Sequence, residues 1–200
     1  PLTASRDERV ARAFETTLEV LRGLGHEVVE RAPDWGGVAG DFVPRYLSGI
    51  AQDVAAVEHP ERLEPRTRGF GRLGRLIPER RLQAGLRRQG EHAARINEIF
   101  DSFDIVLTPT IAEPPVEIGR WAGRGALRTL LGIARVHPFT PVWNHTGQPA
   151  ASVPAPVAAG TAPIGMTLAA APDREELLLS LSAQFEAETA WPERIPEIAA

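Results

Sequence analysis

The sequence predicts an α/β protein, and two observations carry this prediction. Apolar residues recur at helical spacing near both ends of the chain and through much of its middle. Short apolar runs bounded by proline or glycine, at 105–107, 151–153 and 164–168, indicate buried strands. Helical and strand patterns mixed along one chain are typical of this fold class.

The first predicted element is a helix close to the N-terminus. Ser5-Arg6-Asp7-Glu8 has the pattern of a capping box, and apolar residues follow at helical spacing from Val10 to Leu21. Glycines on both sides of Leu24 are expected to end this helix. The run HEVVE, at 26–30, is then predicted as a short strand.

The middle of the chain, from Asp41 to Phe103, is predicted to be mostly helical. Breaks are expected near Pro60, Pro65 and Pro78, because proline lacks the backbone donor that a helix interior needs. The last of these helices leads directly into the apolar strand at 105–107.

The final third is predicted to hold a loop, a hairpin and a helix. Adjacent prolines and several glycines make 111–126 a surface loop or a cleft wall. The five prolines of 138–156 argue against a helix or a long central strand there. The runs AASVP and PIGMTLAAA are interpreted as a hairpin, and 173–176 as the cap of a last amphipathic helix.

Composition excludes several kinds of site. The 200 residues suit one domain, and a net charge of −4 gives no overall attraction to nucleic acid or to an anionic membrane. The chain has no cysteine, which rules out disulfides and thiolate metal sites, and no apolar run approaches the roughly 20 residues that span a bilayer. All 22 basic residues are arginine, so no side chain can act as a lysine base.

Two groups of basic residues fit a structural interpretation better than a functional one. The nine arginines from Arg62 to Arg88 could track phosphate, but a solvated helical face is favoured. His137 and His145 lie eight residues apart with no carboxylate nearby in the sequence, which favours ordinary loop histidines over a metal site.

Three further candidates are interpreted in the same way. Ser152 could be a nucleophile with His145 as its base, but it lacks a Gly-x-Ser-x-Gly elbow and is predicted to be a buried hydroxyl. Glu113 and Glu117 could form a carboxylate pair, but exposed positions are favoured. Trp143 and Trp191 are interpreted as core or lid packing.

Three segments in this order resemble the C-terminal half of the amidase signature family: FDIVLTPT, PFTPVWNHTGQPAASVPAP and PIGMTLAAAPDREELLLSLSAQFEAETAW. LEVLRGLGHEVVE, near the start, is similar to a helix-to-strand segment of the same family. The resemblance covers nearly the whole chain and is strongest from about Ala93 to Trp191. Thr167 departs from the pattern, because the family often carries glutamine there.

The resemblance implies part of a mixed β-sheet flanked by helices. Residues 1–200 would form a single domain, the C-terminal portion of an amidase domain. In the family, a serine nucleophile is activated by a second serine and a neutral lysine, all in the N-terminal half. This chain has no Ser-Ser pair and no lysine. The resemblance therefore implies that the full-length protein hydrolyses linear amides, that no catalytic residue lies in this chain, and that the chain alone is inactive.

The resemblance also implies that the segment ending in PFTPVWN walls a substrate channel for a small-molecule amide. The substrate-lining residues that it points to are Ile133, His137, Thr140, Trp143 and Asn144. Alternatively, Asn144 and Thr146 only hydrogen-bond the turn. No metal or cofactor is implied.

Three explanations of the missing half remain open: a fragment, which is favoured, a catalytic half on a separate chain, or a stand-alone non-catalytic binding or scaffold domain. In the first two, the missing half or another chain covers an open sheet edge. The chain opens at Pro1 without a signal-peptide pattern, and a cytoplasmic location is expected.

Overall fold

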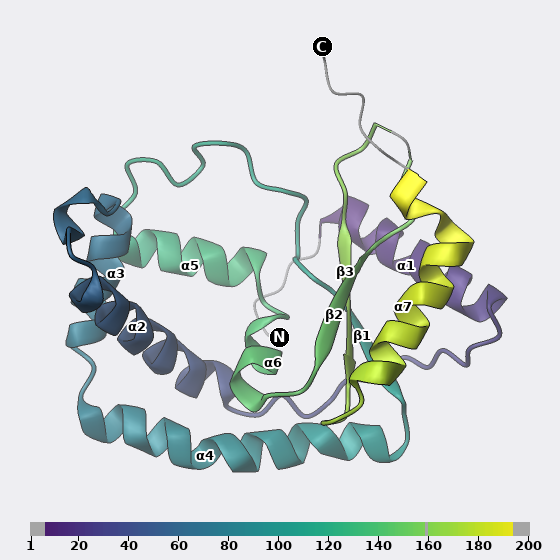
Figure 1. Ribbon diagram of the computed structural model, residues 1–200, viewed down its shortest axis with the longest axis horizontal. Helices are drawn as coiled ribbons and strands as arrows, with labels where there is room; N and C mark the ends of the chain where they lie inside the picture. Colours follow the sequence, from purple (N-terminus) through teal and green to yellow (C-terminus); the bar gives the residue numbers. More distant parts are fainter. Residues whose placement is uncertain (1–6, 159, 194–200) are drawn as a thin grey trace.

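The computed structural model describes residues 7–158 and 160–193, with a small sheet between two groups of helices (Figure 1). Its strands are β1 (Ile105–Pro109), β2 (Ala150–Pro154) and β3 (Gly165–Ala170). They pair antiparallel in the order β1-β3-β2, so Leu168 lies opposite Leu107 on one side and Ala151 on the other. The predicted hairpin, and its place in one sheet with 105–107, are confirmed.

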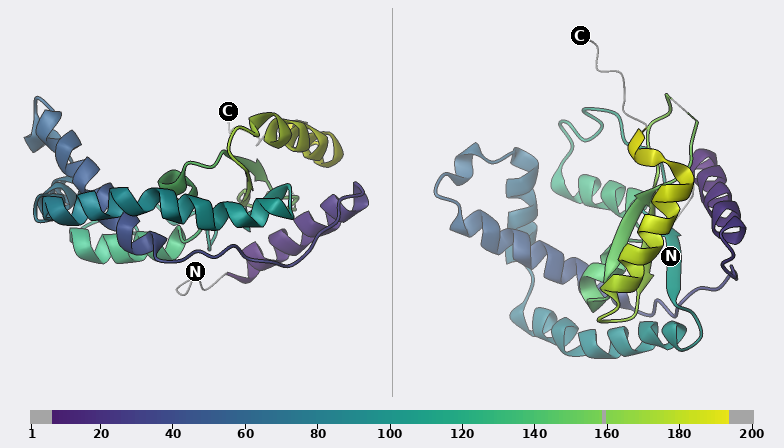
Figure 2. Two further views of the ribbon diagram at one scale, coloured as in Figure 1. Left: turned by 90° about the horizontal axis from the view of Figure 1, so that it is seen from below. Right: turned by 45° about the vertical axis from the view of Figure 1, so that its right-hand side comes forward.

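One face of the sheet packs against the first and last helices, α1 (Glu8–Gly23) and α7 (Glu175–Thr189). Alternation along β3 directs Met166 and Leu168 to this face, where they meet Val10 and Phe185 in a shared core. In the right-hand view of Figure 2, α7 lies in front of the strands while α1 lies beside them. The two helices stay on the sheet because this core buries Val10 and Leu21 of α1 and Leu178 and Phe185 of α7.

The other group of helices comes from the middle of the chain, as predicted. Its members are α2 (Val38–Ala56), the 3-10 turn η1 (Pro60–Arg62), α3 (Pro65–Arg75), α4 (Glu79–Asn97) and the 3-10 turn η2 (Glu98–Asp101). The predicted breaks are confirmed, since Pro60 and Pro65 begin their elements and Pro78 precedes α4. A second core joins Ile96 of this group to Val106 and Ala169 of the sheet.

Two short helices cross from this group to the sheet, α5 (Ala126–Val136) and α6 (Pro141–Thr146). The prediction that 138–156 holds no helix is wrong. Pro141 occupies the first position of α6, where no intrahelical donor is needed, so proline starts this helix instead of breaking it. Gly147 ends it with a φ of 86°.

The predicted strand at 26–30 is also wrong. Within residues 7–158 and 160–193 this segment has no strand partner, and Val28 packs on the first core while Val29 is half exposed. Apolar residues alone do not make a strand, because a strand also needs hydrogen bonds to a neighbouring strand. Among the described residues, no helix combines the length and apolarity that crossing a membrane would require.

Both predicted capping patterns need correction. Ser5 and Arg6 lie outside the described residues, and Asp7 itself caps α1 by accepting the N–H of Arg9 at 2.8 Å. Arg174 is the residue before α7, and Asp173, with a φ of 61°, makes no side-chain cap. The chain then closes with the 3-10 turn η3 (Trp191–Glu193).

Helices α2 and α3 approach so closely that glycine is required between them. A Cβ on Gly74 would collide with the backbone carbonyl oxygen of Leu47, whereas one on the exposed Gly90 of α4 would meet nothing within 4 Å. We expect Gly74→Ala to lower the free energy of unfolding by about 1–3 kcal/mol, because a backbone atom must move. Gly90→Ala should raise it by up to about 1 kcal/mol, since alanine favours a helix interior.

Urea unfolding of the two variants and the parent chain checks this prediction. Equal stability of the two alanine variants would contradict the close approach of α2 to α3.

Candidate functional site

Three hydroxyl side chains meet on the sheet face that is turned away from α1 and α7. The Oγ1 of Thr110, just beyond β1, lies 3.0 Å from Ser152 Oγ and 2.9 Å from Thr167 Oγ1. Ser152 and Thr167 are opposite each other in β2 and β3, so their side chains share a face. Gly165 leaves room for them, because a Cβ there would lie within 3.0 Å of two of these hydroxyls. We call these three residues the hydroxyl cluster.

Ser152 is exposed, so the prediction of a buried hydroxyl is wrong. It lies in β2 opposite Thr167, and its side chain projects from the sheet face turned away from α1 and α7. Its hydroxyl is hydrogen-bonded to Thr110, and in the described part of the chain no histidine is bonded to it. A serine without a base is not activated for nucleophilic attack.

The five predicted substrate-lining residues all come from α5, α6 and the short link between them. His137, at the C-terminal end of α5, and Asn144, in α6, are exposed, while Ile133 and Thr140 are half-buried. Trp143 is instead buried, with its ring edge-on to Trp35 at a centroid separation of 5.7 Å. The five residues therefore lie in one stretch of the chain, with the side chains of His137 and Asn144 exposed and that of Trp143 buried.

The pKa of His137 is lowered by the partial burial of its ring, against the opposing effect of the Glu113 carboxylate. Glu113 is not the exposed loop residue that was predicted. It is half-buried and accepts two hydrogen bonds from Arg120, at 2.5 and 3.1 Å, while Glu117 is exposed as expected. The two glutamates therefore do not act as a carboxylate pair.

The Asn-His-Thr-Gly-Gln run mainly secures α6. Thr146 donates its hydroxyl to the carbonyl oxygen of Val142, four residues earlier in α6, at 2.8 Å. The same hydroxyl contacts the side chain of Gln148, whose amide in turn donates to Asn97 Oδ1 of α4 at 2.8 Å. These bonds fix α6 against α4 and leave Asn144 on the outer side.

His145 is buried, with 1% of its surface exposed, so its interpretation as an ordinary loop histidine is wrong. Its ring faces that of His92 in α4, with centroids 5.4 Å apart and planes at 81°. Neither ring nitrogen of His145 has a hydrogen-bond partner among the described residues. Burial lowers the pKa of His145, and the neighbouring His92 adds to this effect.

Ion pairs between a buried carboxylate and two partly exposed arginines join the first turn of α2 to α4. Asp41, with a side chain 4% exposed, accepts hydrogen bonds from Arg81 at 2.7 Å and from Arg88 at 2.5 and 2.8 Å. These bonds, led by those of Arg88, hold the pKa of Asp41 well below its usual range. His92 Nε2 lies 3.3 Å from the same carboxylate. We call Asp41, Arg81, Arg88 and His92 the α2–α4 network.

Sequence reasoning missed this network, although a signal was present. Arg81, Arg88 and His92 follow one another at intervals of seven and four, which places them on one face of a helix. Most other arginines of the run are exposed, so the solvated face is confirmed away from the network. No group of three or more histidine or acidic residues suited to a metal ion occurs in the described part of the chain.

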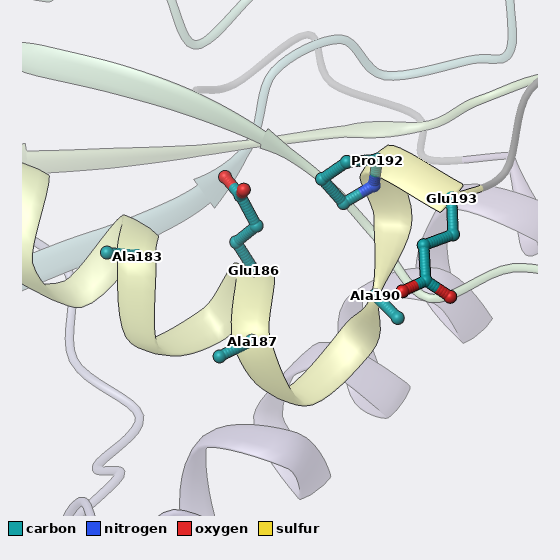
Figure 3. A pocket seen from close by; sticks show the side chains of 6 residues that line it. All are labelled: Ala183, Glu186, Ala187, Ala190, Pro192 and Glu193. Carbon is teal, nitrogen blue, oxygen red and sulfur yellow. The ribbon is translucent and has the colours of Figure 1, made fainter.

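A surface cavity of about 410 Å³ lies at the end of α7. Figure 3 shows its lining, which consists of Ala183, Glu186, Ala187, Ala190, Pro192 and Glu193. Alanine and proline dominate it, and no base or nucleophile accompanies the two glutamates. It is therefore a weaker candidate than the exposed surface of α5, α6 and the link between them, which carries His137 and Asn144. We call this the α5–α6 surface.

Comparison with known proteins supports one family. The family model described as Amidase matches residues 2–179. A Mycobacterium bovis protein named "Putative amidase AmiB2" is 41% identical over 199 residues, which is 99% of this chain and 43% of the relative. "Putative amidase AmiA2" from Mycobacterium tuberculosis is 31% identical over 190 residues, covering 94% of this chain and 39% of the relative. The chain thus spans about two-fifths of the length of these relatives.

Solved structures support the same fold. A 6-aminohexanoate cyclic dimer hydrolase in complex with its substrate has a TM-score of 0.78 and 24% identity, covering 96% of this chain and 44% of that one. A crystal structure of an amidase has a TM-score of 0.76 and 21% identity, covering 92% and 43%. The α/β fold class is therefore confirmed, with three antiparallel strands in the described residues.

We expect Asp41→Asn to destabilise the chain by about 2 kcal/mol, because it weakens charged hydrogen bonds that typically contribute about 1.5–3 kcal/mol. The guanidinium groups of Arg81 and Arg88 are partly exposed, which keeps the expected loss of stability toward the lower end of this range. The matched control is Asp53→Asn, at an exposed position of the same helix. Thermal unfolding measures both, and equal melting temperatures would show that the α2–α4 network contributes no stability.

The stability of the chain should fall on acidification from about pH 7.5 to about pH 5.5 because of His145. Its pKa in the folded chain is lowered, so below the ordinary histidine pKa of about 6.5 the unfolded chain binds more protons. Arg45 adds to this lowering, and Asp41 opposes it. We expect His145→Leu to reduce the pH dependence and to leave stability at neutral pH unchanged or higher, since two unpaired buried nitrogens disappear.

The control is His59→Gln, which removes an exposed histidine. If the parent chain and the His145→Leu variant had the same melting curves across this pH range, His145 would not be the cause of the pH dependence.

Proposed function

Because the chain belongs to the amidase family, we propose that it forms the structural and substrate-lining part of a hydrolase that cleaves carboxylic amides. The observation that carries this proposal is the family match over residues 2–179, together with 41% identity to a relative named as an amidase. The proposal extends to linear amides as substrates and to a cytoplasmic location.

In this proposal the nucleophile and its base come from the rest of the amidase domain, as a serine pair and a lysine. This chain has no lysine, and arginine holds its proton too tightly to serve as a base. A complementary polypeptide is therefore required for turnover.

The contribution of this chain is to position the substrate. Asn144 carries both a donor and an acceptor, which match the carbonyl and N–H groups of an amide. The lowered pKa of His137 favours the neutral imidazole near neutral pH, so it can accept or donate one hydrogen bond. The bonds of Thr146 and Gln148 hold α6 rigid behind them, as a binding surface requires.

The sheet offers a place for the complementary part. Among the described residues, β1 and β2 each pair only with β3, so each has an unpaired edge. Such edges are normally covered, because their free N–H and C=O groups invite pairing. We propose that the missing half of the amidase domain, or another chain, covers at least one of them.

The alternative to this proposal is a non-catalytic binding or scaffold domain with amidase-like architecture. The absence of lysine is compatible with both candidates, because the hydrolase would take its lysine from the rest of the amidase domain. Activity in the presence of the upstream polypeptide separates the two candidates.

We expect no amide turnover by the 200-residue chain alone, and turnover when it is combined with the upstream polypeptide of its reading frame. In the combined protein, Asn144→Ala should lower kcat/KM roughly tenfold, as the loss of one hydrogen bond of about 1.5 kcal/mol would. Gln52→Ala, on an exposed position of α2, is the control and should have no effect.

Release of ammonia or amine from a simple aliphatic amide is the measurement. Turnover by the lone chain that Ser152→Ala abolishes would replace the proposal with a serine–histidine mechanism. A combined protein that binds amides without hydrolysing them would favour the scaffold alternative.

A further inference from the structure

A second cavity, of about 270 Å³, lies between α5 and the loop that precedes it. Six of its lining residues are Arg120, Trp121, Arg124, Arg128, Leu131 and Arg135. The indole of Trp121 lies directly on the backbone of α5 at Gly132, because a Cβ at Gly132 would collide with the ring. A large aromatic side chain thus joins the loop to the helix at the cavity wall.

The lining carries an excess of positive charge. It contains four guanidinium groups and one carboxylate, that of Glu113. Glu113 is bound by Arg120 in a two-bond pair, which leaves Arg124, Arg128 and Arg135 without a carboxylate partner in the described part of the chain. All three are exposed, in a chain whose overall charge is −4. Three unpaired cations around one small cavity favour an anionic ligand.

Two of the guanidinium groups are oriented by Trp121. The Cζ atoms of Arg120 and Arg124 lie 5.0 and 5.5 Å from the centroid of its ring, within the range of cation–π contact. A guanidinium held against an aromatic ring loses less conformational freedom when it binds, and it presents planar donors that match a carboxylate.

The cavity also offers apolar surface. The side chain of Leu131 is 60% exposed. It lies beside Trp121 in the lining, so a ligand with an apolar body would cover both side chains. Inorganic phosphate would satisfy the arginines and leave this surface in water.

We propose that this cavity binds a small organic carboxylate. Arg124, with Arg128 or Arg135, holds the carboxylate group, and Trp121 and Leu131 contact the apolar body. Glu113 neutralises Arg120 and keeps it stacked on the ring. The inference rests on the cavity alone and does not require the proposed hydrolysis.

The cavity lies next to the α5–α6 surface, since Arg135 precedes His137 by two residues and Glu113 acts on both Arg120 and His137. Carboxylates are what amide hydrolysis releases, which gives the cavity a source of ligand under the proposed function.

Isothermal titration of the chain at low ionic strength tests the inference with three probes: hexanoate, the neutral hexanamide and inorganic phosphate. We expect hexanoate to bind at least about tenfold more tightly than either of the others, because only hexanoate offers both a charge and an apolar body. Equal binding of hexanamide would overturn the role of the arginines. Equal binding of phosphate would overturn the role of Trp121 and Leu131.

Two pairs of variants locate the site. Arg124→Gln with Arg128→Gln should weaken hexanoate binding at least about tenfold, whereas Arg72→Gln with Arg75→Gln, which removes the same charge from exposed positions of α3, should not. Gly132→Ala should also weaken binding by displacing Trp121, while Gly90→Ala should not. Equal losses within either pair would show that hexanoate is not bound in this cavity.

Discussion

The pairing of β3 with strands on both of its edges is the interaction on which the rest of the structure depends. It brings together segments from 105–109 and 150–154, which are separated by two helices and a long loop. Alternate residues of β3 point to opposite faces of the sheet. Leu168 lies in the core beneath α1 and α7, and Ala169 lies in the core beside α4 and α6. The hydroxyl cluster exists only because this pairing places Ser152 opposite Thr167.

The α2–α4 network gives the helical group a fixed position relative to the sheet. Asp41 joins α2 to α4, and α4 in turn carries Asn97, which receives the hydrogen bond from Gln148 beyond α6. Helix α6 is thereby held with Trp143 in the core and Asn144 outside. The outer position of Asn144 thus depends in part on the ion pairs that Asp41 makes with Arg81 and Arg88.

Sequence reasoning predicted the helices of the middle region, the three strands and the family, because apolar periodicity and the order of motifs can both be read directly along the chain. It failed where the outcome depends on partners far along the chain. Residues 26–30 pair with no strand in the described part of the chain, and Ser152 is exposed on the sheet face turned away from α1 and α7. His145 is buried because α4 covers it, and Pro141 begins a helix that the proline count argued against. The cluster of arginines around Trp121 depends likewise on how a loop folds onto α5.

We propose that this chain is one part of an amidase domain whose sheet is completed by the rest. Hydrogen–deuterium exchange of the backbone amides of β1 and β2, with and without the upstream polypeptide, detects whether that part covers the free strand edges. We expect amides on these edges to exchange at least about tenfold more slowly in the mixture, while those of β3, already bonded on both sides, change little. Unchanged exchange in both edge strands would contradict it.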